Sequence, residues 1–454
     1  MTAALRKTYF RYLIAFVLTA LSTMLGNILD GIIAGQLIGA DAVAAIGTSR
    51  PLTQGFYTLH LLIGAGGGML AGLAIGKKRR DEANVVFRTV VCTMAAIAAV
   101  ATAVGATMPQ AVTRFFCTDA ALQPLAEPYV FWMMVGAFAY FGMYLMQTYV
   151  AVDGEPGLVT GAVVVDNTVN VILSVVLIKY FDMGVAGAAI GTVVGHALAA
   201  LLLLALHWRP RENHVVLGFS MVSSSEQSNN PNNLNNPNNP NNRTILRIVS
   251  QGAPLAIASM SLTALLYSAN LIIMGTLGKD GMFIYAVALN LLLVYNLFLA
   301  GACQTLQSLG AIEKGKGGPG FGEVVKFTYL LLAVSSTAVC VFAWICPGVI
   351  ASLFGGGKRP ELLAATNSAL RVFAPSFILF CLIYVHMIVC KLEKKSGIAL
   401  FISFALSLTV IPVLWSFARF APAYIWWSYL VAYVIEIAAI VVLEQIVFKE
   451  RSPS

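Results

Sequence analysis

Two acidic side chains lie inside long apolar stretches of the sequence. Asp30 falls in GNILDGIIAGQLIGAD, which begins at Gly26, and Asp166 falls in VVVDNTVNVILSVVLI. A charge at the centre of a lipid bilayer costs about 2.5–3.5 kcal/mol on insertion scales, so an acid kept there usually has a function. We interpret Asp30 as a candidate cation-binding residue. The simpler alternative is a carboxylate that only hydrogen-bonds a neighbouring helix.

A polar stripe accompanies the second acid. Asp166, Asn170 and Ser174 are spaced i, i+4 and i+8, which places them on one face of a helix. Together with Asp30 they could offer oxygen ligands to a small cation. Alternatively, an acid removed from water could carry a proton, because burial favours its uncharged form. The spacing leaves both kinds of coupling open, and a polar seam that only holds helices together is a third interpretation.

The composition indicates that these segments cross a membrane. Of 454 residues, 59% are hydrophobic and 11% are charged, whereas soluble proteins contain roughly 25% charged residues. The net charge is +8, but the basic residues lie between apolar runs and form no compact basic domain. We therefore expect the lipid bilayer as a partner and no nucleic acid.

Apolar runs of about 20 residues, the length needed to cross a bilayer, predict an all-α polytopic membrane protein with twelve transmembrane helices. The predicted spans lie near residues 11–36, 47–75, 87–109, 126–151, 157–180, 184–207, 248–278, 282–310, 325–350, 368–391, 396–417 and 422–447. With the N-terminus placed in the cytoplasm, most Lys and Arg fall in cytoplasmic loops. This bias predicts a multi-pass protein of the cytoplasmic membrane with both termini inside the cell. The N-terminus shows no cleavable signal peptide.

A tract rich in Asn and Pro divides the chain near its middle. We predict an N-terminal six-helix lobe over residues 1–208, a cytoplasmic linker over 209–247 and a C-terminal six-helix lobe over 248–454. Short alignments lay Asp30 on Asn270 and Gly35 on Gly275. Because six is an even number of spans, the halves would be parallel repeats related by a pseudo-two-fold axis along the membrane normal.

Before its last span, the C-terminal half offers amides and aromatic residues rather than acids within its predicted spans. The candidates for an adaptable cavity that binds a bulky, cationic ligand are Tyr267, Asn270, Asn290, Gln304 and Glu436. Their alternative is ordinary packing or lipid contact. The same alternative is favoured for the membrane histidines His60, His196 and His386, and for the seven cysteines, which lack metal-binding or disulfide spacing. Close helix packing, rather than phosphate binding, explains the glycines of LLIGAGGGMLAGLAIGKKRRDEAN.

Several motifs resemble those of the multidrug and toxic compound extrusion (MATE) family. They are NILDGIIAGQLIGADAVAAIG in the first span, GAGGGMLAGLAIGKKRRDEA at the end of the second and DMGVAGAAIGTVVG entering the sixth. The resemblance covers essentially the whole chain and is clearest over residues 20–90 and 140–200. It implies two lobes that alternate access, and efflux of organic cations or other drugs driven by inward Na⁺ or H⁺.

The resemblance also implies a coupling site in the N-terminal lobe. The family's Asp of span one, Asn of span five and Thr of span six match Asp30, Asn170 and Thr192. The family's second acid falls on Ser174, so a carboxylate is missing there. Asp166, one turn before Asn170 on the same face, is the candidate to replace it. A possible Na⁺ at Asp30 is the only metal expected.

We therefore predict a secondary-active antiporter that is not an enzyme, needs no cofactor besides the coupling ion and acts as a monomer on small organic substrates. A flippase for lipid-linked or other amphipathic substrates is the alternative, although intramembrane Lys and Arg are nearly absent. A membrane-embedded enzyme is a remote alternative, since the sequence contains no HExxH or GxSxG motif. A receptor or scaffold would not need a duplicated six-span half.

Overall fold

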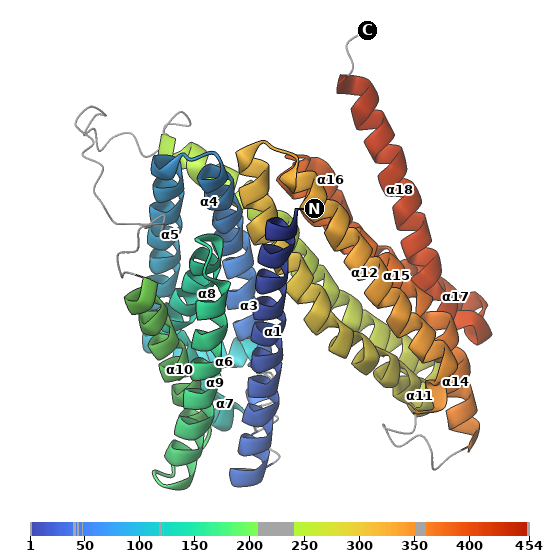
Figure 1. The fold of residues 1–454 in the computed structure, drawn as a ribbon. Coiled ribbons are helices and arrows are strands. Elements are labelled where there is room, and N and C mark those ends of the chain that lie inside the picture. The colour runs from blue at the N-terminus through green and yellow to red at the C-terminus, as the bar shows by residue number, and fades with distance from the viewer. Residues whose placement is uncertain are drawn as a thin grey trace. The chain divides into compact units, whose positions relative to one another are not determined.

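The chain is described by a computed structural model that covers residues 2–39, 42, 45–47, 49–117, 120, 122–207, 240–349 and 360–451 (Figure 1). All regular elements in these ranges are helices, which confirms the predicted all-helical class. The physical reason is that a helix satisfies its own backbone hydrogen bonds, as lipid requires. The chain divides into two compact units, which are described in turn.

The N-terminal unit comprises Thr2–Gly252 together with Ala311–Gly318. Its helices are α1 (Ala3–Leu37), α3 (Arg50–Leu59), a π-helical turn (His60–Ala65), α4 (Gly66–Gly76), α5 (Arg80–Thr107), α6 (Pro109–Phe116), α7 (Gln123–Val135), α8 (Ala137–Val152), α9 (Pro156–Lys179) and α10 (Gly184–His207). Helices α7 and α8 form the predicted fourth span, bent by 54° at the break between them.

The C-terminal unit comprises Ala253–Gly310 and Pro319–Ser454. Its helices are most of α11 (Pro240–Lys316), then α12 (Gly320–Ile345), α14 (Pro360–Phe373), α15 (Pro375–Leu392), α16 (Ser396–Leu408), α17 (Val410–Phe420), a 3₁₀ turn (Pro422–Trp427) and α18 (Ser428–Arg451). Helix α11 breaks at Gly278, where φ is 64°. Glycine adopts this left-handed conformation without Cβ strain, and the break separates the predicted spans 248–278 and 282–310.

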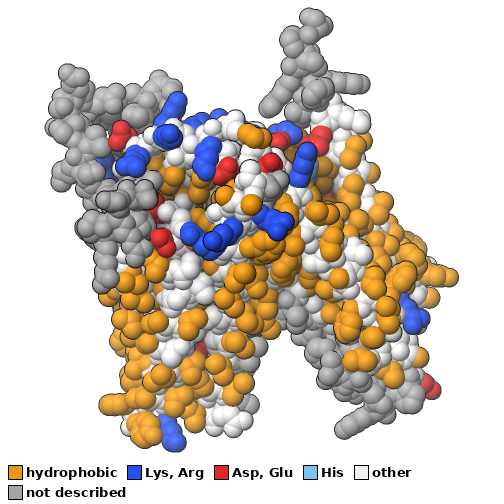
Figure 2. All heavy atoms as spheres, in the orientation of Figure 1, with side chains coloured by type: hydrophobic (Ala, Val, Ile, Leu, Met, Phe, Trp, Pro, Cys, Tyr) orange, Lys and Arg blue, Asp and Glu red, His pale blue; other side chains and the backbone are white. Residues whose placement is uncertain are grey.

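The described helices support a polytopic membrane protein. Ten of them are long and apolar enough to cross a bilayer, and the bent α7–α8 pair adds an eleventh. The remaining predicted span, residues 282–310, forms the part of α11 beyond its break. Figure 2 shows hydrophobic side chains over most of the helical surface, with Lys and Arg gathered toward one end of the helices of the N-terminal unit.

Glycines allow the start of α11 to pack against the N-terminal unit. A Cβ added to Gly252 would lie 1.8 Å from the carbonyl oxygen of Leu62, and one added to Gly66 would lie 2.4 Å from that of Ile248. This close approach supports the packing interpretation of the glycine-rich segment. It also explains why this unit extends to Gly252, beyond the predicted lobe that ends at residue 208. Of the predicted linker, residues 209–239 lie outside the described residues, and α11 already begins at Pro240.

Candidate functional site

The N-terminal unit brings the predicted coupling residues together around Asn170. The Nδ2 group of Asn170 on α9 donates to both carboxylate oxygens of Asp30 on α1, at 3.0 and 3.1 Å. The hydroxyls of Ser174 on α9 and Thr192 on α10 each donate to the Oδ1 atom of Asn170 at 3.2 Å. One amide therefore connects an acid to two hydroxyls and links three helices.

Burial fixes the orientation of the Asn170 amide in this network. Asn170 is 4% exposed and Ser174 is 1% exposed, whereas Asp30 is partly exposed. A buried amide whose two ends are both hydrogen-bonded is fixed in orientation, because breaking either end leaves a polar group unsatisfied. Asp30 and Thr192 are thus the partly exposed members of the network, and Asp30 is the one of the two that can carry a charge.

Asp166 and His196 form a second polar pair one helical turn away. The Nδ1 atom of His196 lies 2.9 and 2.8 Å from the two carboxylate oxygens of Asp166. The ring of Tyr140 packs against His196 at a centroid distance of 5.4 Å, and that of Tyr144 at 6.1 Å. Asp166 shares a helix face with Asn170 as predicted, and the hydrogen bonds described for its carboxylate go to His196.

His196 is the residue whose part in the site the sequence reasoning missed, since packing was the favoured interpretation of the membrane histidines. A signal was present in the spacing. Thr192 and His196 are one turn apart on α10, as Asp166 and Asn170 are on α9. Once Thr192 faces Asn170 across two packed helices, His196 has to face a residue one turn away from Asn170.

The polar groups of α9 fit against α10 because α10 presents glycines to them. A Cβ on Gly191 would lie 2.2 Å from the Oγ atom of Ser174, and one on Gly195 would lie 2.6 Å from an oxygen of Asp166. Gly187, one turn earlier, faces Leu177 and Ile178 in the same way. The motif DMGVAGAAIGTVVG therefore lets the two backbones approach closely.

Side-chain contacts between α1 and α9 set the register that brings Asp30 to Asn170. The hydroxyls of Thr19 and Thr160 lie 3.2 Å apart, and Asn167 donates to Ser22 at 2.9 Å. Gly26 leaves room for Asn167, because a Cβ there would lie 2.2 Å from its side-chain oxygen. Asp30 follows Gly26 by about one helical turn, so the same helix face continues to Asn170.

The candidates for a C-terminal cavity differ in their surroundings. Tyr267 is 67% exposed and Asn270 is also exposed, whereas Gln304 is half-buried and Glu436 is 1% exposed. The side chain of Asn290 lies outside the described residues. Neither carboxylate oxygen of Glu436 has a hydrogen-bond partner within the described part of the chain. A shared cavity for these residues stays a prediction.

The Asp166–His196 pair predicts non-additive effects on stability. We expect the double variant Asp166→Ala with His196→Ala to lose less free energy of unfolding than the two single variants lose in sum. The difference, the coupling energy, should be about 0.5–3 kcal/mol. The reason is that either single change leaves a buried polar partner behind. Thermal unfolding of the purified protein in detergent measures this.

The matched control combines His196→Ala with Asn167→Ala. Asn167 lies next to Asp166 in sequence but bonds to Ser22 on α1, so this cycle should be additive. Equal coupling in both cycles would contradict the assigned pair.

Comparison with models of known protein families finds one family that matches both halves of the chain. The family model MatE matches residues 15–176 and again residues 254–416. Because one model matches both halves, this agrees with the predicted internal repeat.

Two curated relatives come from Bacillus subtilis. The probable multidrug resistance protein YoeA is 24% identical over 209 residues, which is 44% of each chain. The probable multidrug resistance protein YpnP is 25% identical over 194 residues, which is 41% of this chain and 43% of the relative. The chain therefore aligns with less than half of the length of either relative.

Solved structures share the fold over nearly the full length. A crystal structure of MATE in the bent conformation gives a TM-score of 0.78 at 17% identity and covers 97% of this chain and 96% of its own. The multidrug transporter DinF-BH in complex with R6G gives 0.78 at 19%, covering 98% and 95%. A MOP superfamily transporter from Pyrococcus furiosus, described as having a binding pocket of reverse polarity that suggests a different function, gives 0.79 at 17%, covering 96% and 94%.

Proposed function

The chain belongs to the MatE family, and from this premise we propose that it is a secondary-active exporter. It moves drugs or other organic compounds, often cationic, out of the cell in exchange for Na⁺ or H⁺ by alternating access. Proteins of this family are membrane transporters rather than enzymes. The drug class is proposed because YoeA and YpnP carry the description of probable multidrug resistance proteins. The excess of Lys and Arg in alternate loops supports a cytoplasmic location for both termini.

The single observation that carries the coupling mechanism is the contact between Asp30 and Asn170. An acid in the first span is held by a buried amide, which is itself held by Ser174 and Thr192. A cation or proton that neutralises Asp30 removes the negative charge that accepts the hydrogen bonds of the Asn170 amide. Such a change biases the packing of α1 against α9, and the coupling to export is the difference in ion affinity between two conformations.

The arrangement favours the proton as the coupling ion. Asn170 directs its N–H group, not its oxygen, toward Asp30, and its oxygen accepts from Ser174 and shares the hydroxyl of Thr192 with the carbonyl oxygen of Ala188. A Na⁺ ion at Asp30 prefers oxygen ligands, so the amide would have to exchange its two ends. A proton requires no such exchange, because a protonated carboxyl can still accept a hydrogen bond from Asn170.

The test is export of a fluorescent organic cation from proteoliposomes, with the pH gradient and the Na⁺ gradient imposed separately. We expect the pH gradient to drive export and the Na⁺ gradient alone to drive little. Export that needs Na⁺ and ignores pH would reverse the choice of ion. Failure of both gradients to drive any of several structurally different organic cations would contradict the exporter function itself.

A second carboxylate in the network should shift the preference toward Na⁺. Ser174→Asp places an acid beside Asn170 at the position where the family pattern has one. Two acids attract a cation more strongly than one. We expect the apparent affinity for Na⁺ in the export assay to rise by roughly tenfold, about 1.4 kcal/mol.

The control for this change is Ser174→Asn, because Asn has nearly the same size as Asp but carries no charge. An equal gain in Na⁺ dependence with Asn would show that volume, not the added charge, is responsible.

A further inference from the structure

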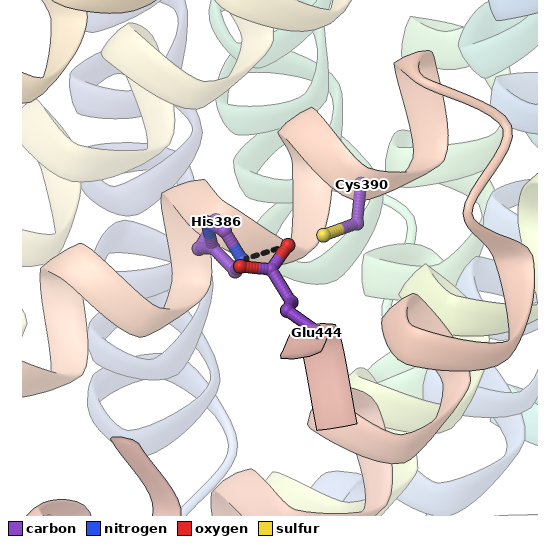
Figure 3. A group of neighbouring side chains, drawn as sticks. All are labelled: His386, Cys390 and Glu444. Carbon is purple, nitrogen blue, oxygen red and sulfur yellow. Dashed lines mark ion pairs between the residues drawn. The ribbon is translucent and has the colours of Figure 1, made fainter. Parts of the chain in front are cut away.

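A second group of chemically reactive side chains lies in the C-terminal unit. His386 and Cys390 are one turn apart on α15, so they share a face of that helix. Glu444 reaches them from α18. One donor atom of each residue lies within 4.8 Å of the others, and Figure 3 shows the three side chains pointing toward one another.

The donor types match a zinc site. Zn²⁺ is bound by Cys sulfur at about 2.3 Å, by His nitrogen at about 2.0–2.1 Å and by carboxylate oxygen at about 2.0–2.2 Å. A thiolate and an imidazole together favour Zn²⁺ over Na⁺, Mg²⁺ or Ca²⁺, which prefer oxygen ligands. One thiolate and one carboxylate also balance the two positive charges of the metal.

The imidazole is oriented for metal binding. The hydroxyl of Tyr329 on α12 lies 3.0 Å from Nδ1 of His386, and metal-binding histidines usually engage their other nitrogen in this way. The remaining nitrogen, Nε2, lies 3.4 Å from a carboxylate oxygen of Glu444. Nε2 is buried and has no hydrogen-bond partner among the described residues.

The neighbouring Lys395 does not depend on Glu444 alone for an acidic partner, so Glu444 is available to bind a metal. Lys395 lies 3.4 Å from Glu444 and 2.9 Å from Glu393. The contact with Glu393 is the shorter of the two. A metal that takes over Glu444 therefore leaves Lys395 paired with Glu393.

Exposure provides a route of entry. Cys390 is fully buried, whereas the side chains of His386 and Glu444 are 28% and 33% exposed. Because Nε2 of His386 and the thiol of Cys390 are buried, a metal would enter past the partly exposed Glu444.

We propose that His386, Cys390 and Glu444 form a binding site for a thiophilic divalent cation, with Zn²⁺ as the best match, that joins α15 to α18. The cysteine spacing alone gave no sign of it, because its ligands come from two helices far apart in sequence. Since the site lies in the C-terminal unit, away from Asp30 in sequence and contacts, it does not depend on the proposed export function.

The experiment uses the full-length protein in detergent, stripped with a chelator and then titrated with Co²⁺ and Zn²⁺. We expect one site per chain whose Co²⁺ form shows thiolate-to-cobalt charge-transfer absorption. Cys390→Ser should abolish that absorption, and Glu444→Gln should weaken Zn²⁺ binding by more than about tenfold. Tyr329→Phe should weaken it by about tenfold, as loss of an orienting partner does. Cys381→Ser, which removes another buried thiol of α15, should leave both readouts unchanged.

Unchanged Zn²⁺ affinity in Cys390→Ser, or a Co²⁺ complex without the thiolate band, overturns the proposal. Thermal unfolding without metal shows whether each variant is folded. Should Cys390→Ser not fold, the double change His386→Gln with Glu444→Gln decides alone, because both side chains are partly exposed. Wild-type affinity in that variant overturns the site, and its loss supports it.

Discussion

Asp30→Asn is expected to lower ion-driven export by about 5–150-fold while leaving the protein folded. The carboxylate is the only group of the Asn170 network that can lose or gain a charge, so its replacement removes the difference in ion affinity between conformations. Coupling energies of this kind are typically 1–3 kcal/mol, and their loss lowers export by about 5–150-fold. The measurement is initial export of a fluorescent organic cation from proteoliposomes under a fixed pH gradient.

The matched control is Asp182→Asn, which makes the same chemical change at an exposed turn after α9. Its φ of 53° suits Asn as well as Asp. Binding of the organic cation to the purified Asp30→Asn protein, measured by fluorescence polarisation, separates loss of coupling from loss of substrate binding. Full export by Asp30→Asn would show that coupling does not pass through this residue.

Gly191→Leu is expected to have the largest effect on stability. Even a Cβ at this position would meet the Oγ atom of Ser174 at 2.2 Å and the carbonyl oxygen of Asn170 at 2.9 Å. The larger side chain has to push α10 away from α9, and overpacking of this kind costs about 1–3 kcal/mol or more. The same displacement separates Thr192 from Asn170, so export should fall along with the unfolding temperature.

Gly161→Leu is the comparison. Gly161 also lies within a membrane helix, α9, but apart from its own stretch of helix no atom of the described residues lies within 4 Å of a Cβ added there. This variant should unfold at the wild-type temperature and keep its export. A similar loss of stability in both variants would point to a general effect of replacing helix glycines, and not to the α9–α10 contact.

The sequence by itself determined the class of fold. Long apolar runs have to become helices in lipid, because the backbone has no water to bond with, and their number and the distribution of Lys and Arg follow from local composition. It also determined which coupling residues share a helix face, since the spacing of Asp166, Asn170 and Ser174 follows from 3.6 residues per turn. The matches of the MatE model to both halves agree with the repeat read from short alignments.

Only the tertiary structure decided the partners across helices. Whether Asp166 meets Asp30 or His196 depends on how α9 is rotated against α1 and α10, and glycines such as Gly191 and Gly195 set that rotation and distance. The same holds for Cys390, which is an ordinary apolar-run cysteine until α18 brings Glu444 beside it. Helical periodicity fixes a side chain's direction on its own helix. The facing residue depends on packing between segments far apart in the chain, which a local pattern does not encode.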